Sequence, residues 1–249
     1  MIFEPKSYHH YFREGRFMGF SIVINRNSFW IGTDPFSFKP EMKELAEERI
    51  KTVIGELENY MADEPFFKKS LKPCEVTEAA PEIIKKAAKA AFLGGTGPMA
   101  AIPAVLCETI SEAMLANFQL EELIVEDGNN LYLKLQESLN VCIFAGESPL
   151  SEMAGINIKP EQTPVAVCSS SGTKGSLLNY GKADVVLVAS ANAALAGALA
   201  TGFNNLLKKP ADVEKVLARA KAIPEVTGAL TVFDDQVGLH GSFELNMLD

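Results

Sequence analysis

Cysteine and histidine are scarce in this chain. They number seven together: Cys74, Cys107, Cys142, Cys168, His9, His10 and His240. No two cysteines have the CxxC spacing, so a Cys/His zinc site has little to draw on and no disulfide framework is indicated. Met1–Pro5 does not open a signal peptide, because no basic start leads into an apolar run. We therefore expect a cytoplasmic protein with reduced thiols.

Two phosphate-binding motifs and an excess of positive charge are also missing. No GxGxxG follows the first strand, and no GxxxxGK[ST] occurs, which argues against a Rossmann or P-loop nucleotide site. The net charge of −9 repels phosphate backbones and anionic headgroups, so we expect neither nucleic acid nor a membrane as a general partner. A local basic pocket for a phosphate is compatible with that charge.

Long uncharged stretches are rare, and one of them is long enough for us to consider a membrane span. Val185–Phe203 spans 19 residues without a charge, close to the length that crosses a bilayer. Its first part, Val185–Ala189, is rich in valine and strand-like, whereas an alanine-rich helix follows from about Asn192. Ser190 and Gly197 weaken the membrane interpretation further, so we expect a strand followed by a helix.

The composition is that of an ordinary folded protein of 249 residues, with 47% hydrophobic and 22% charged residues. A chain of this length can bury most of its apolar surface without disulfides or bound metal ions to stabilise it. No long linker or low-complexity segment divides the chain, so we expect a single domain over residues 1–249. The sequence leaves open whether that domain consists of two similar halves.

The first half of the chain predicts strands and then helices. Strands are expected over Tyr8–Arg13, Met18–Asn25 and Phe29–Thr33. Apolar residues at three- and four-residue steps then predict helices, over Pro40–Met61 and Pro81–Phe92. A long helix follows over Met99–Phe118, in which Pro103 marks either a kink or the true start.

The second half alternates short strands with helices. Strands are predicted over Leu123–Glu126, Leu131–Leu135, Val141–Ala145, Val165–Cys168 and Val185–Ala189. After the helix from Asn192 come a charged helix, Ala211–Ala222, and a hairpin of Ala229–Phe233 and Val237–Leu245. Hairpin turns outnumber crossovers, which favours an α+β fold of layered antiparallel sheets with helix pairs over a doubly wound nucleotide fold.

The glycine-rich segment at residues 94–101 is the first candidate for chemistry. Its glycines let backbone approach a ligand closely, and a helix start behind them offers free N–H groups. A tight helix-to-helix turn explains the same residues equally well. The candidate ligand-binding residues here are Gly94, Gly95, Thr96, Gly97, Met99 and Ala100.

The serine-rich loop after the predicted strand Val165–Cys168 is the second candidate. It presents hydroxyl donors to an anion, and Lys174 supplies a point charge for phosphate. A solvated polar loop accounts for the composition nearly as well, and a serine nucleophile is weaker because no histidine lies nearby in sequence. The candidate residues are Ser169, Ser170, Ser171, Gly172, Thr173 and Lys174.

Acidic residues are the candidates for catalysis. Glu108 is one charge on an otherwise apolar helical stretch, which fits either a site residue or a side chain facing water. Asp127 precedes Gly128, a pairing that favours a hairpin turn over a site. Asp234 and Asp235 likewise indicate a hairpin tip rather than a metal clamp.

Four short segments of the chain carry a pattern that is specific when taken in order. Residues 97–101 read Gly-Pro-Met-Ala-Ala, and residues 145–151 read Ala-Gly-Glu-Ser-Pro-Leu-Ser. Residues 170–173 read Ser-Ser-Gly-Thr, and residues 181–184 read Gly-Lys-Ala-Asp. In this order they resemble an uncharacterised prokaryotic family related to the ApbE-type FAD:protein FMN transferases. The resemblance extends from about Lys39 to the C-terminus. It implies an ApbE-like, T-fold-like architecture and a flavin or related nucleotide in the cleft.

The chain departs from the relatives at the positions that the resemblance links to a metal. A Gly-Gly-Asp turn is replaced by Gly128-Asn129-Asn130, and an Ala-Asp-Ala-x-Ala-Thr run, whose aspartate helps to hold magnesium, has Gly197 in place of that aspartate. A histidine of the serine loop is Ser176 here. Magnesium prefers carboxylate oxygens, so the loss of these acids makes a magnesium site doubtful unless Asp127 or Asp184 compensates.

We therefore interpret the chain as an ApbE-like protein with a cleft for FAD, FMN or a related nucleotide. We expect residues 94–101 and 169–174, together with Thr201, to line it, and metal-dependent transferase activity to be weak or lost. An active magnesium-dependent FMN transferase or a related phosphohydrolase, using Glu108, Asp127 or Asp184, is one alternative. A non-catalytic module with a vestigial cleft that binds a protein partner is another.

Overall fold

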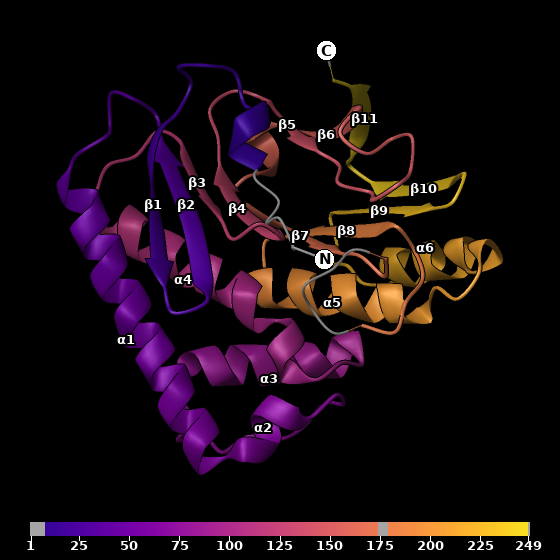
Figure 1. Ribbon diagram of the computed structural model, residues 1–249, viewed down its shortest axis with the longest axis horizontal. Helices are drawn as coiled ribbons and strands as arrows, with labels where there is room; N and C mark the ends of the chain where they lie inside the picture. The colour runs from indigo at the N-terminus through magenta and orange to yellow at the C-terminus, as the bar shows by residue number, and fades with distance from the viewer. Residues whose placement is uncertain (1–7, 174–178, 249) are drawn as a thin grey trace.

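The computed structural model of the chain describes residues 8–173 and 179–248. A large antiparallel sheet forms its middle layer (Figure 1), with the strand order β1-β2-β3-β4-β7-β8-β9-β10. A second sheet has the order β11-β6-β5. The strands are β1 Met18–Ile24, β2 Asn27–Thr33, β3 Leu123–Glu126, β4 Asn130–Lys134, β5 Leu139–Cys142, β6 Ala154–Ile158, β7 Val165–Ser170, β8 Val185–Ser190, β9 Gly228–Phe233, β10 Gln236–Gly241 and β11 Glu244–Met247.

Helices cover one face of the large sheet, and the small sheet covers part of the other (Figure 1). The helices are α1 Glu41–Asp63, α2 Pro65–Lys69, α3 Glu82–Gly94, α4 Ile102–Asn117, α5 Ala193–Leu206 and α6 Val213–Lys221. Short 3-10 turns occur at Tyr8–Tyr11, Pro98–Ala100, Pro160–Gln162 and Pro210–Asp212. The arrangement is the expected α+β layering of antiparallel sheets and helices.

Alternating side chains of the large sheet build two separate cores. On β8, Val186 and Val188 join the core beneath the helices, whereas Val185 and Leu187 join the core beneath the small sheet. Successive side chains of a strand point to opposite faces, and here both faces are covered. This explains why β8 is a continuous run of apolar residues rather than an alternating one.

Helix α5 lies at the centre of the helical layer. It packs against α3, α4, β7 and β8, and every residue from Ala193 to Asn204 is buried. A Cβ atom on Gly202 would come within 2.1 Å of the carbonyl oxygen of Gly94, so glycine is required for α3 and α5 to approach this closely. The 19-residue uncharged run is therefore a buried strand and a buried helix. Among the described residues no helix has both the length and the apolar character needed to cross a membrane.

The signals for helix starts are confirmed at two places. Pro103 is in the first turn of α4, so it marks the start of that helix and not a kink. Asn192 is the N-cap of α5, and its side-chain oxygen accepts a hydrogen bond from the backbone N–H of Leu195 at 3.0 Å.

Three strand predictions are wrong, the first entirely and the other two in part. Tyr8–Arg13 begins as a 3-10 turn, because the Tyr8 ring is buried against the edge of Phe144 instead of lying in a sheet. The strand expected over Val141–Ala145 is β5 and ends at Cys142. The strand expected over Val237–Leu245 is broken at Gly241, whose φ of 82° turns the chain from the large sheet into the small one.

Candidate functional site

A pocket of about 180 Å³ lies beside the second half of α5. Five of the predicted ligand-binding residues line it: Thr96, Gly97, Met99, Ala100 and Thr201. The remaining lining residues are Lys68, Ser70, Leu71, Tyr180 and Asn205. Segments from four parts of the chain thus meet at one place, although nothing in their spacing shows that they meet.

Two close backbone contacts shape this pocket. A Cβ atom on Gly97 would come within 1.9 Å of the Ser70 carbonyl oxygen, so only glycine lets the chain after α2 pack directly against residues 96–100. A Cβ atom on Gly94 would come within 2.8 Å of the Ala198 carbonyl oxygen. Gly95 ends α3 in the left-handed conformation, with a φ of 65°, and turns the chain toward the pocket. Gly94 and Gly95 therefore position the site without lining it.

Thr96 carries a hydroxyl group without a partner. Its side chain is only 2% exposed, and its Oγ1 atom makes no hydrogen bond with any described residue. Buried polar atoms in folded proteins are almost always paired, so an exception needs an explanation. Because Thr96 also lines the pocket, a bound molecule is the simplest partner for it.

The serine loop is fastened to α5 next to this pocket. The Asn204 side chain donates a hydrogen bond to the Ser170 carbonyl oxygen at 3.0 Å, and the Gly172 N–H donates to the Ala183 carbonyl oxygen at 2.9 Å. The Ser169 hydroxyl donates to the Asn129 carbonyl oxygen at 3.0 Å. The described serines thus connect α5 with the β3–β4 turn, and none of them lines the pocket. Lys174 and Ser176 lie outside the described residues.

Glu108 is occupied in a structural ion pair. Its carboxylate accepts a hydrogen bond from the Lys86 Nζ atom at 2.8 Å and one from the backbone N–H of Ala193, the first residue of α5, at 3.3 Å. Burial lowers the pKa of Lys86, but the hydrogen bond and charge of Glu108 outweigh burial, so the pKa is raised overall. Glu108 therefore neither faces water nor lines the pocket that holds Thr96.

Asp127 holds the turn between β3 and β4. Its Oδ1 atom accepts hydrogen bonds from the backbone N–H groups of Asn129 and Asn130, at 3.0 and 2.9 Å. The Asn130 side-chain amide donates to both of its carboxylate oxygens. Burial raises the pKa of Asp127, despite these donors. Its oxygens are committed within the turn, as the Asp-Gly pairing predicts.

Asp184 lies just before β8 and contacts the hairpin of β9 and β10, where neither of the other two acids lies. Its Oδ2 atom accepts a hydrogen bond from the backbone N–H of Asp234, at 2.9 Å, in the turn between β9 and β10. Glu108 at the start of α5, Asp127 in the β3–β4 turn and Asp184 before β8 are thus placed separately. The structure does not bring the three catalytic candidates together.

The residues present do not fit a magnesium ion. Within residues 8–173 and 179–248, no three His, Cys, Asp or Glu side chains are grouped to hold a metal. The pocket lining contains a lysine and no carboxylate. A Cβ atom on Gly197 would lie 3.0 Å from the Ala104 Cβ atom, so helix packing closes the space that an aspartate would need. Magnesium prefers anionic oxygen ligands, which this pocket lacks.

A second pocket, of about 550 Å³, lies at the start of α5. It is lined by residues of α3, such as Lys86 and Lys89, by Asn192 at the α5 N-cap, by Glu108 of α4 and by Glu225 before β9. Its central charges pair with each other, since Glu108 binds Lys86 and Glu82 lies 3.7 Å from Lys85. The first N–H of α5 is also satisfied, by Glu108. This pocket is larger, but its polar groups are mostly occupied.

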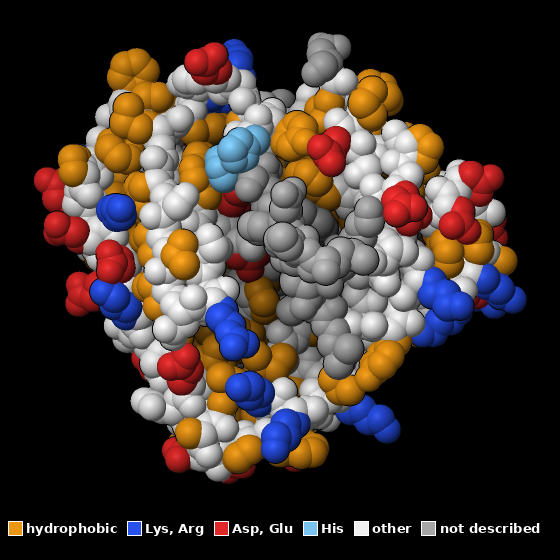
Figure 2. All heavy atoms as spheres, viewed as in Figure 1, with side chains coloured by type: hydrophobic (Ala, Val, Ile, Leu, Met, Phe, Trp, Pro, Cys, Tyr) orange, Lys and Arg blue, Asp and Glu red, His pale blue; other side chains and the backbone are white. Residues whose placement is uncertain are grey.

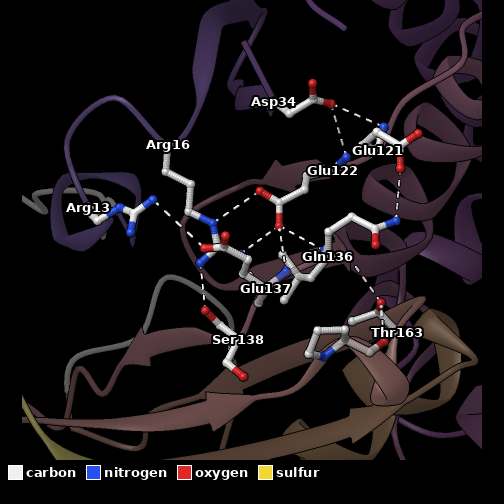
Figure 3. Close-up of polar contacts among 11 residues, drawn as sticks. Arg13, Arg16, Asp34, Glu121, Glu122, Gln136, Glu137, Ser138 and Thr163 are labelled. Carbon is white, nitrogen blue, oxygen red and sulfur yellow. Dashed lines mark hydrogen bonds and ion pairs between the residues drawn. The ribbon is translucent and has the colours of Figure 1, made fainter. Parts of the chain in front are cut away.

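A third polar cluster ties the N-terminal segment to the large sheet (Figure 3). Arg16 donates two hydrogen bonds to the Glu122 carboxylate, at 3.2 and 2.7 Å, and also binds the carbonyl oxygens of Glu137 and Ser138. Burial raises the pKa of Glu122, but the hydrogen bonds from Arg16 and the backbone outweigh it and lower the pKa overall. Asp34 accepts from the backbone N–H groups of Glu121 and Glu122. Every drawn group has a partner, so the cluster is structural.

Sequence reasoning missed Lys68 and Asn205. Lys68 is one of a pair of lysines at the end of α2, which the sequence offers only as charged residues closing a helical section. Asn205 follows the conspicuous Ala196–Thr201 run by one helical turn. Only the spacing of Asn205 from Thr201, four residues along one helix face, signals that they share a pocket.

The layered sheets, with helices on one face, define an ApbE-like α+β fold. The apo crystal structure of flavinyl transferase ApbE from Pseudomonas stutzeri matches at a TM-score of 0.60 and 13% identity, covering 93% of this chain and 94% of that one. A family model described as AbpE bacteria matches residues 10–233.

Relatives from archaea place the chain more closely. A UPF0280 protein of Methanocella arvoryzae is 35% identical over 194 residues, which cover 78% of each chain. A UPF0280 protein of Methanococcus maripaludis is 32% identical over 231 residues, covering 91% of each. This chain belongs to the UPF0280 family.

Proposed function

We propose that this protein binds a flavin nucleotide, or a closely related nucleotide, and that it has weak or no metal-dependent transferase activity. The observation that carries the proposal is the buried hydroxyl of Thr96, a residue that lines the pocket, because this hydroxyl has no hydrogen-bond partner among the described residues. At about 180 Å³ the pocket is smaller than the roughly 300–1,000 Å³ of a complete small-molecule site, so it suits one part of a nucleotide.

The placement of the carboxylates supports the second half of the proposal. Transfer of FMN from FAD breaks a phosphoanhydride bond, and a metal ion bound to the phosphates supplies the usual electrophilic activation. Here Glu108, Asp127 and Asp184 are engaged in separate structural contacts. The pocket itself offers no carboxylate to anchor a metal. Binding can persist under these conditions, whereas activation of the phosphoanhydride lacks its main contributor.

A thermal-shift titration with FAD, FMN and ADP, each with magnesium and with EDTA, tests both halves. A ligand that binds only the folded protein stabilises it by about 2.7 kcal/mol at a hundredfold excess over its dissociation constant. We expect a shift with FMN or FAD that is the same in EDTA. No shift with any of the three would overturn the binding proposal and direct attention to protein partners.

The active alternative makes a different prediction for the same samples. Chromatography of the FAD sample would then show AMP and protein-bound or free FMN, with magnesium and not with EDTA. Loss of that turnover in Asp184→Ala would establish the acid as catalytic and would contradict weak or absent transfer.

A further inference from the structure

We propose that Lys68, Thr96 and Asn205 form a subsite for the phosphate group of the ligand, and that this subsite works without a metal. The inference rests on the proposed nucleotide-binding function and deepens it, because it names the ligand group and the residues that recognise it.

Hydrogen-bond donors outnumber acceptors among the free polar groups of the pocket. Asn205 accepts a hydrogen bond from the Tyr180 N–H on its Oδ1 atom, at 2.6 Å, so its Nδ2 group is the half left to donate. The Ser70 hydroxyl already donates to the Lys72 carbonyl oxygen at 2.6 Å. Lys68 donates only, because an ammonium group has no acceptor. The free polar groups of the lining are therefore mainly donors, which suit an anionic oxygen.

Lys68 brings a positive charge to the pocket. Lys68 lines the pocket, and within the described residues no Asp or Glu lies close enough to form an ion pair with it. In the larger pocket, Lys85 and Lys86 each have an acid within ion-pair distance, whereas Lys89 has none among the described residues. An unpaired lysine beside a buried donor binds phosphate as a point charge.

The surface around Lys68 is locally basic. Lys68, Lys69 and Lys72 are all exposed at the end of α2, in a protein whose net charge is −9. Figure 2 shows Lys and Arg side chains (blue) below the central hollow of this face, where Figure 1 places α2 and α3. A local positive region on an acidic protein attracts an anionic ligand to this side of the hollow.

The geometry also explains why the buried hydroxyl is kept. Thr96 is 2% exposed and lines the pocket, and its Oγ1 atom has no hydrogen-bond partner among the described residues. Gly97 cannot carry a side chain without meeting the Ser70 carbonyl oxygen, so the segment next to Thr96 is fixed in place. A phosphate oxygen in the pocket would pair the hydroxyl, and Lys68 would neutralise its charge.

The test compares FMN with riboflavin, which differ by the phosphate group alone, by fluorescence titration in EDTA. We expect the protein to bind FMN at least about tenfold more tightly than riboflavin, the ratio for one good charged contact. Lys68→Ala and Thr96→Val should each reduce that preference about five- to tenfold and leave riboflavin affinity unchanged. Lys69→Ala and Thr96→Ser are the matched controls and should keep it, because Lys69 does not line the pocket and serine retains the hydroxyl.

The outcomes separate the subsite from the flavin proposal. Equal affinity for FMN and riboflavin would overturn the phosphate subsite and leave a flavin site standing. If neither flavin binds, inorganic pyrophosphate is the remaining probe: stabilisation that disappears in Lys68→Ala keeps the subsite and rejects the flavin. No response to pyrophosphate either would reject both. Melting temperatures of the variants establish that each one folds.

Discussion

The two pockets beside α5 differ in what their polar groups do. At the start of the helix, a space of about 550 Å³ is bordered by Glu108 and Lys86, which bind each other at 2.8 Å. Beside its second half, a space of about 180 Å³ is bordered by a lysine without an ion-pair partner among the described residues and by the unpaired hydroxyl of Thr96. Volume favours the first pocket as a site, and unsatisfied donors favour the second.

This difference separates two kinds of polar residue: those that hold segments of the protein together and those that are left for a ligand. Glu108 and Glu122 are buried acids whose oxygens are taken up by partners from other segments, and the half-buried Asp127 binds the backbone and side chain of its own turn. Such groups hold elements together, and removing one partner leaves a costly unpaired charge. Thr96 has no internal partner, so its hydroxyl stabilises nothing within the protein. Groups left unsatisfied are the better guide to a ligand than cavity size.

Among the paired polar groups, we expect the largest loss of stability on substitution at Arg16. Arg16→Ala should lower the free energy of unfolding by about 3 kcal/mol, because it leaves the Glu122 carboxylate buried without its cation. Urea unfolding measures this loss. Arg13→Ala is the control: its contact with Glu137 is 3.9 Å long with both side chains largely exposed, so we expect a change below about 0.5 kcal/mol. Equal effects in the two variants would contradict the structural reading of the cluster.

The same cluster predicts a dependence on pH. The folded-state pKa of Glu122 is lowered from its ordinary value of 4.5, so its contribution to stability is present above that pH and is lost as the pH falls below it. The melting temperature of the wild type should drop between about pH 5 and pH 3 more steeply than that of Arg16→Ala. Parallel curves would show that the carboxylate does not depend on Arg16.

The pair at the start of α5 is the next largest effect. Glu108→Ala should cost about 2 kcal/mol, because it leaves Lys86 half-buried and the first N–H of α5 without an acceptor. Glu112→Ala removes the outer and exposed partner of Lys86, at 3.3 Å, and should cost less than about 0.5 kcal/mol. A Glu108→Ala variant of unchanged stability that loses a turnover activity would make Glu108 catalytic instead.

Replacing the unpaired Thr96 hydroxyl should change the free energy of unfolding in the opposite direction. Thr96→Val should raise the free energy of unfolding by about 1 kcal/mol without ligand, because an unpaired buried hydroxyl is replaced by a methyl group of the same shape. Thr231 has an equally buried and unpaired hydroxyl on β9, outside the pocket. Thr231→Val should therefore stabilise similarly and leave FMN affinity unchanged. A destabilised Thr96→Val would mean that the hydroxyl has an internal role.

The smallest expected effect is at Asp184. Asp184→Ala removes one hydrogen bond at the exposed β9–β10 turn and should cost no more than about 1 kcal/mol in chemical unfolding. Asp235→Ala, which alters an exposed residue of the same turn, should be neutral. Abolished ligand binding in Asp184→Ala would place this acid in the site and break the comparison.

Local signals let much of the fold be predicted from the sequence. Asn192 precedes an alanine-rich run, and Pro103 lies inside an apolar one. Asparagine caps helix N-termini and proline fits the first helical turn, and both residues are found at helix starts. Tyr8 misled because aromatic residues are common in strands, while the buried ring here fills a space between β5 and the serine loop. Such a position is decided by distant segments, which no local pattern reveals.

The candidate site divides in the same way. Thr96 and Gly97 could be selected because glycines before a helix start let backbone approach a ligand closely, and the structure places both residues at a pocket. Whether they bind a ligand stays a prediction. Lys68 could not be selected, since its meaning depends on Gly97 letting α2 pack within contact distance of residues 96–100. The acids misled because a carboxylate looks the same in sequence whether it is free or committed to a turn.

Calorimetric titration of FMN into the protein, first in EDTA and then with magnesium, tests the central claim most directly. We expect one saturable site whose dissociation constant is the same in both buffers, because Lys68 and neutral donors hold the ligand and the pocket has no carboxylate for a metal. Binding that occurs only with magnesium would contradict it.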